Sequence, residues 1–223
     1  MRRRLLVCGI ASSLLYAAMN VLAPMLYEGY SSVSQTISEL SAIGAPTRPL
    51  WVVLAIAYTL LVAAFGWGVW MSAGSRRSLR TAGVLIIAYG LIGIFWPPMH
   101  RREVLAAGGG TLTDVMHIAF TFSLFLIMAA IAYAAAAFGR RFSIYSLATL
   151  VVMVAFGVLT GLESPGIHTG RPTPWIGVWE RTSAAAFLLW IFVLGIALRR
   201  EAEAQPKAVS GPKGLLVHSL QGR

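Results

Sequence analysis

The chain has 223 residues, of which 57% are hydrophobic and only 12% are charged. A soluble domain carries roughly a quarter charged residues, so this composition excludes an ordinary soluble protein. The net charge of +10 would suit nucleic acid, but the Lys and Arg residues stand in short clusters between long apolar runs, which indicates membrane topology and no nucleic-acid partner. The one cysteine, Cys8, lies in the first apolar run and excludes an internal disulfide.

Six segments lack Asp, Glu, Lys and Arg over a length that can cross the apolar core of a bilayer, about 17–25 helical residues. None shows strand-like alternation, so we predict an all-α fold, a polytopic membrane bundle of six transmembrane helices. The first segment exceeds the apolar region of a signal peptide, about 7–15 residues, and is interpreted as a retained helix. The segments are residues 5–26, 50–71, 81–98, 115–138, 142–162 and 182–198.

Charge predicts the orientation. With the N-terminus inside, all but five of the 18 Lys and Arg residues fall on the inner side, and short basic loops remain cytoplasmic. We therefore expect a multi-pass protein of the cell (plasma) membrane, surrounded by the lipid bilayer, with both termini cytoplasmic. Residues 1–200 form the transmembrane domain, and residues 201–223 are predicted to be a disordered cytoplasmic tail. The five outer residues are Arg48, Arg101, Arg102, Arg171 and Arg181.

The other polar groups gather on the opposite side from the basic clusters. Six of the eight acids and three of the four histidines fall on the outer side. Chemistry, where there is any, is thus expected outside. These residues are Glu28, Glu39, Glu103, Asp114, Glu163, Glu180, His100, His117 and His168.

The first outer loop has apolar residues at helical spacing, with Gly44 as a stop. The pattern predicts a short amphipathic helix at the membrane surface. This helix either plugs the outer mouth of the bundle or displays polar side chains toward its centre. The apolar residues are Val33, Ile37, Leu40 and Ile43, and the polar ones are Ser34, Ser38, Glu39 and Ser41.

The fourth and sixth spans begin with ionisable residues. Asp114 suits the first turn of a helix, where the helix dipole favours an acid. His117 lies three residues further on the same face, so Asp114 is its expected partner. Glu180 and Arg181 open the last span, and we expect Arg181 to pair with Asp114 or Glu163.

These groups are predicted to converge on one outer pocket, from which a metal site could also be built. Three histidines and an open position would suit catalytic zinc, which activates a bound water. The chain has no HExxH spacing, so such a site would require tertiary convergence. Haem is disfavoured, because it would require histidines deep within facing membrane helices, and only His117 approaches such a position. The metal candidates are His100, His117 and His168; the pocket candidates are Ser34, Ser38, Glu39, His100, Asp114, His117, Glu163, His168, Glu180 and Arg181.

The loop sequence Ser34-Gln35-Thr36-Ile37-Ser38-Glu39-Leu40, the following Gly44-Ala45-Pro46, His117 and the Glu180-Arg181 pair carry a resemblance. The chain resembles the bacterial and archaeal membrane proteins catalogued as domain of unknown function 998, over nearly its whole length to Arg200. The resemblance implies a multi-helix membrane fold and no established activity. In that family the third span often ends in Phe-Pro followed by an acid, whereas this chain has Trp96-Pro97-Pro98-Met99-His100.

The sequence allows three functional hypotheses, and the third, a transporter, is disfavoured because the six spans carry no charge near the membrane centre and no clear inverted repeat. In the first, the outer pocket binds a lipid or small amphiphile, or the protein is a partner subunit whose polar groups close the bundle. In the second, the chain is a membrane-embedded hydrolase, with or without zinc, that acts on a lipid-like substrate at the outer leaflet. Burial favours a base near neutrality, and Glu39 or His117 would serve. The catalytic candidates are Ser38, Glu39, Asp114 and His117.

Overall fold

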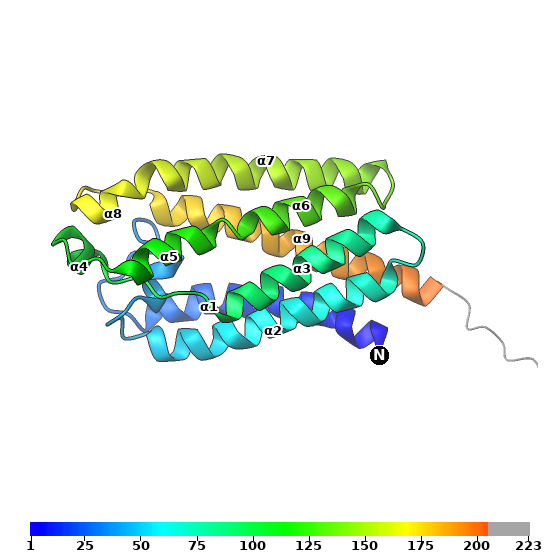
Figure 1. Ribbon diagram of the computed structural model, residues 1–223, viewed down its shortest axis with the longest axis horizontal. Coiled ribbons are helices and arrows are strands. Elements are labelled where there is room, and N and C mark those ends of the chain that lie inside the picture. Colours follow the sequence, from blue (N-terminus) through cyan, green and yellow to red (C-terminus); the bar gives the residue numbers. More distant parts are fainter. Residues whose placement is uncertain (205–223) are drawn as a thin grey trace, which may run out of the picture.

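The computed structural model describes residues 1–204, and the regular structure of that part is helical, without a strand. The six predicted spans are confirmed as helical segments long and apolar enough to cross a membrane. Figure 1 shows them running along one long axis, with the N-terminus and the end of the last helix at the same end. The helices are α1 (Arg2–Met25), α2 (Arg48–Ser72), α3 (Arg77–Ile94), α5 (Leu112–Thr121), α6 (Leu124–Ala135), α7 (Arg140–Glu163) and α9 (Ile176–Ala204).

The helices pack as a closed ring. Helix α1 contacts α2, α2 contacts α3, α3 contacts α6, α6 contacts α7, α7 contacts α9, and α9 returns to α1. The side chains inside the ring form one apolar core, which includes Leu6, Phe65, Ile86, Ile131 and Trp190. Large apolar side chains also cover the outside of the helices, as the lipid-facing surface of a membrane protein requires.

Helices α2 and α3 approach each other backbone to backbone. A Cβ atom added at Gly66 would lie 2.9 Å from the carbonyl oxygen of Gly83, and one added at Gly83 would lie 2.7 Å from the backbone nitrogen of Trp70. Small residues allow such close approach, and close packing holds helices together where lipid offers no hydrophobic drive. This pair is therefore the tightest wall of the ring.

Several helix boundaries differ from the sequence prediction. Helix α3 ends at Ile94 and not at residue 98, because Pro97 disfavours helical backbone in the residue before it. The fourth span is interrupted at Phe122 and Ser123, where the backbone hydrogen bonds tighten to three-residue spacing. The last helix begins at Ile176, six residues early, and extends to Ala204, so the first four residues of the predicted tail are helical. The remainder of that predicted tail lies outside the described residues.

Three short elements lie at the end of the bundle away from the N-terminus and from the end of α9 (Figure 1). We call this end, with its connecting loops, the polar end. The 3₁₀ helix η1 stands where the sequence predicts a surface helix, but it spans only five residues and buries Ile37 and Leu40 against α1 and α2. The elements are η1 (Ile37–Ser41), α4 (Arg102–Ala106) and α8 (Pro165–Thr169).

Candidate functional site

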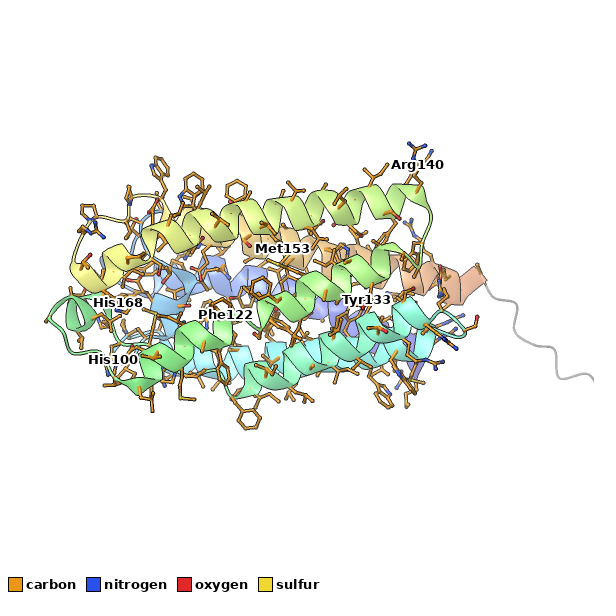
Figure 2. All side chains as sticks on the ribbon, turned by 45° about the horizontal axis from the view of Figure 1, so that its top comes forward. His100, Phe122, Tyr133, Arg140, Met153 and His168 are labelled. Atoms are coloured by element: carbon orange, nitrogen blue, oxygen red, sulfur yellow. The ribbon has the colours of Figure 1, made fainter. Side chains whose placement is uncertain are left out.

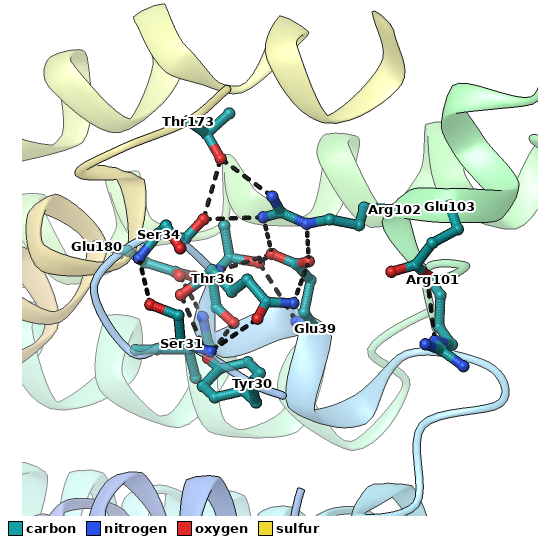
Figure 3. Close-up of polar contacts among 12 residues, drawn as sticks. Tyr30, Ser31, Ser34, Thr36, Glu39, Arg101, Arg102, Glu103, Thr173 and Glu180 are labelled. Atoms are coloured by element: carbon teal, nitrogen blue, oxygen red, sulfur yellow. Dashed lines mark hydrogen bonds and ion pairs between the residues drawn. The ribbon is translucent and has the colours of Figure 1, made fainter. Parts of the chain in front are cut away.

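The centre of the polar end is an ion pair between Glu39 of η1 and Arg102 of α4 (Figure 3). The Nε and Nη2 atoms of Arg102 donate to the two carboxylate oxygens at 2.5 and 2.8 Å. The Glu39 side chain is only 3% exposed. The hydrogen bond with Glu39 raises the pKa of Arg102 above its ordinary value, so the guanidinium stays charged.

Glu39 also begins the helix on which it lies. Its carboxylate accepts from the backbone N–H of Thr36 at 2.7 Å, while the Thr36 hydroxyl accepts from the N–H of Glu39. This reciprocal capping satisfies the free amides of the first turn. Arg102 adds a hydrogen bond to the carbonyl of Ser34 at 3.0 Å, and so does the hydroxyl of Thr173. The Glu39 carboxylate thus fixes η1 to α4, and its oxygens are fully occupied.

The first turns of α9 hold the loop before η1. Glu180 accepts from the backbone N–H of Ile37, and Arg181 donates to the carbonyls of Ser32 and Gln35 at 2.9 Å each. Arg181 also donates to the hydroxyl of Tyr30, and burial raises the pKa of that hydroxyl. Both charges of this pair are therefore used to bind the backbone and Tyr30.

Asp114 caps α5 and binds His100. Its carboxylate accepts from the backbone N–H of Thr111 at 2.8 Å, in a second capping box. It also accepts from the backbone N–H of His100 at 2.7 Å and lies 2.9 Å from the Nδ1 atom of that ring. Asp114 is consequently an anchor for the segment that follows α3.

His117 lies between this segment and η1. Its Nδ1 atom is 2.7 Å from the carbonyl oxygen of Pro97, and its Nε2 atom is 3.1 Å from the hydroxyl of Ser38. A carbonyl only accepts, so Nδ1 carries the proton and donates to Pro97. In the neutral ring, Nε2 is then the unprotonated nitrogen and accepts from Ser38. The indole nitrogen of Trp96 also lies 3.2 Å from Nδ1, but it cannot donate to a protonated nitrogen.

Two further residues of the predicted pocket, Glu163 and His168, lie on α7 and α8. Glu163, at the end of α7, accepts from the indole N–H of Trp179 at 3.0 Å. His168 is exposed on α8. Figure 2 shows His100 and His168 at the same end of the molecule, opposite Arg140.

Two pairings expected from the sequence are wrong. Arg181 does not pair with Asp114 or Glu163, because carbonyls of the loop before η1 occupy it. His117 does not bond to Asp114. The segment after α3 places His100 against the Asp114 carboxylate and the carbonyl of Pro97 against His117. Spacing along one helix placed His117 and Asp114 on one face, but a partner from another segment lay closer to each.

The three histidines do not gather. Among residues 1–204, no group of three or more His, Cys, Asp or Glu side chains is arranged to hold a metal ion. His100 binds Asp114, His117 binds Ser38, and His168 is exposed.

Arg102 is the main residue that the sequence did not single out. A buried Glu39 requires a cation, but five arginines fall on the same side of the predicted membrane and spacing does not distinguish them. Pro97 was also missed as the partner of His117, because a carbonyl acceptor has no sequence signature.

An open pocket of about 190 Å³ lies between α4 and α8. Ala106 and Ile167 give it apolar walls, and Arg102, Glu103 and Arg171 give it charge. Glu39 balances Arg102, and Arg101 lies 3.2 Å from the carboxylate of Glu103. Arg171 donates from Nε to Thr169, and its two terminal nitrogens have no protein partner in the described part of the chain. The pocket therefore has a surplus positive charge.

One family model matches most of the chain. The family described as "Protein of unknown function (DUF998)" matches residues 10–197, which include all six helical spans in whole or in large part. No curated protein matches the chain, and no solved structure does.

Proposed function

The chain belongs to the DUF998 family of proteins of unknown function, and we propose that it binds the acidic head of a lipid-like amphiphile at the outer face of the cell membrane. The pocket between α4 and α8 is the observation that carries this proposal. In this proposal the polar end faces outward, and both termini are cytoplasmic.

The distribution of arginine supports that orientation. Ten arginines lie in the described part of the opposite end, in the first turns of α1, α3 and α7, directly before α3 and at the end of α9. Clusters of this kind stay on the cytoplasmic side of a membrane. They are Arg2, Arg3, Arg4, Arg76, Arg77, Arg80, Arg140, Arg141, Arg199 and Arg200.

The lining of the pocket supports an amphiphile with an acidic head. A phosphate or carboxylate would take the terminal nitrogens of Arg171, which present a fork of donors suited to paired oxygens. Ala106 and Ile167 give apolar contact beside it. Phe95 and Leu112, 75% and 72% exposed at the same end, offer surface for an acyl chain in the bilayer.

Binding of a fluorescent phosphatidylglycerol to the purified protein in detergent tests the proposal. We expect it to bind more tightly than the matching phosphatidylcholine, and Arg171→Gln to weaken it about 5–10-fold, the effect of about 1 kcal/mol from one exposed charge. Arg141→Gln, an exposed arginine at the opposite end, is the matched control and should leave affinity unchanged. Equal affinity for both lipids, or an Arg171→Gln protein that binds normally, would contradict the proposal.

A further inference from the structure

We infer that Ser38 is a nucleophile and His117 its general base, and that the pair hydrolyses an ester of an amphiphile drawn from the bilayer. The inference goes beyond binding, because it depends on a hydrogen bond that the α4–α8 pocket does not include.

The geometry meets the requirements for an activated serine. A nucleophile and its base lie within hydrogen-bond reach, and a third group orients the base. Here the Ser38 hydroxyl is 3.1 Å from Nε2 of His117, and the carbonyl of Pro97 holds Nδ1–H at 2.7 Å. That carbonyl fixes the tautomer in which Nε2 accepts a proton, the role that a carboxylate has in other serine hydrolases.

The neighbouring acids are not available as the base. Arg102 and the Thr36 amide occupy the carboxylate of Glu39, and the amides of Thr111 and His100 occupy that of Asp114. The hydroxyls that Glu39 and Asp114 accept are those of the helix caps Thr36 and Thr111. Among the candidate bases, His117 is the one within hydrogen-bond distance of the Ser38 hydroxyl. The geometry thus chooses between the two bases that the sequence left open.

The pair lies beside an apolar surface. His117 is buried at 5% exposure and Ser38 is half-buried. Helix α5, on which His117 lies, exposes Val115 and Met116. Phe95, just before the segment that orients His117, is 75% exposed. An acyl chain lying on this surface would bring its ester toward Ser38 from within the bilayer, so the substrate class is an acyl ester with a long apolar chain.

The reaction balances with water as the second substrate. The oxygen of Ser38 bonds to the ester carbonyl carbon while its proton moves to Nε2 of His117. The carbon–oxygen bond to the alcohol then breaks, and the proton on Nε2 passes to the departing oxygen, which leaves acyl-Ser38. Water attacks that carbonyl, gives one proton to Nε2, and the bond to Ser38 breaks; the proton returns to Ser38 and the carboxylic acid departs.

Labelling with an alkyl fluorophosphonate tests the inference. This reagent forms a phosphorus–oxygen bond to an activated serine and releases fluoride, and it carries no acidic head, so its result is independent of the α4–α8 pocket. We expect one label per chain in the peptide that contains Ser38, and none in Ser38→Ala. His117→Gln should slow labelling by at least about 100-fold, because it removes the base.

Ser41→Ala is the matched control. Its hydroxyl donates to the carbonyl of Ser38 from the same 3₁₀ turn at 3.0 Å, so the change is local but leaves the Ser38–His117 contact in place. Labelling of Ser41→Ala should equal that of the unchanged protein. A folded protein that takes no label, or that takes it equally on another serine, overturns the inference.

A second measurement applies if His117→Gln does not fold. In a Cys8→Ala background, Ser38→Cys should react with iodoacetamide faster than Ser41→Cys, because a thiol paired with a histidine is more often a thiolate. Equal rates for the two cysteines would overturn the inference.

Discussion

Most charged side chains of the polar end are bound to the protein's own backbone. Glu39 and Asp114 cap helices, Glu180 accepts a backbone amide, and Arg181 donates to three carbonyls. A charge buried away from water costs free energy unless it is hydrogen-bonded, so each of these side chains has several partners. The Ser38–His117 pair differs, because neither group is needed to cap a helix or balance a charge.

The ion pair of Glu39 gives a prediction about stability. Glu39→Gln leaves Arg102 charged and largely buried without its partner, so we expect a loss of about 3 kcal/mol in unfolding free energy. Unfolding by sodium dodecyl sulfate from mixed micelles measures it. Glu28→Gln, at an exposed acid of the same loop, should change stability by less than about 0.5 kcal/mol. Equal effects would show that the ion pair does not stabilise the polar end.

At the scale of elements, the start of α9 contacts the loop before η1 through backbone atoms. The amide of Gly177 donates to the carbonyl of Val33 at 3.0 Å. A Cβ atom at this position would collide with the carbonyl oxygens of Ser32 and Gln35, which the loop presents to Arg181. Glycine is therefore required here by the close approach of two backbones.

Gly177→Ala should accordingly lower the unfolding free energy by about 1–3 kcal/mol, the usual effect of overpacking. Gly157→Ala is its control: Gly157 also lies in a helix, but an added Cβ meets nothing within 4 Å. We expect that change to be neutral or slightly stabilising, since alanine favours helix more than glycine does. Thermal unfolding in detergent compares the two, and a Gly177→Ala protein as stable as Gly157→Ala would contradict the packing argument.

The pattern of apolar segments predicted the elements better than their ends or contacts. Hydrophobic length alone indicates six helices, because every span must satisfy its own backbone in lipid. The boundaries at Ile94 and at Phe122 depended on local geometry that length does not contain. The same holds for the candidate site. The sequence named Ser38, Glu39, Asp114 and His117, but which of these residues contact each other depends on the packing of three loops. Spacing along one helix predicted a contact between Asp114 and His117 that the structure does not have.

For the whole molecule, the proposed orientation can be tested from both ends. Glu28 and Ser75 are exposed in loops at opposite ends of the bundle. In a Cys8→Ala background, we expect a membrane-impermeant maleimide to label Glu28→Cys in intact cells and Ser75→Cys only after lysis, because the basic end stays inside. Labelling of Ser75→Cys alone in intact cells would reverse the orientation and place the polar end in the cytoplasm.

The hydrogen bonds between α9 and the first loop also have a consequence for the order in which the polar end folds. The chain is made from its N-terminal end, so the loop of residues 30–37 leaves the ribosome long before Gly177, Glu180 and Arg181 exist. Until the last span is inserted, the carbonyls of Ser32 and Gln35 and the amide of Ile37 must be hydrated or bound elsewhere. The first loop of the polar end to be synthesised is thus the last to obtain all its hydrogen bonds. A chain that stops before its sixth span lacks the residues of α9 that hold this loop.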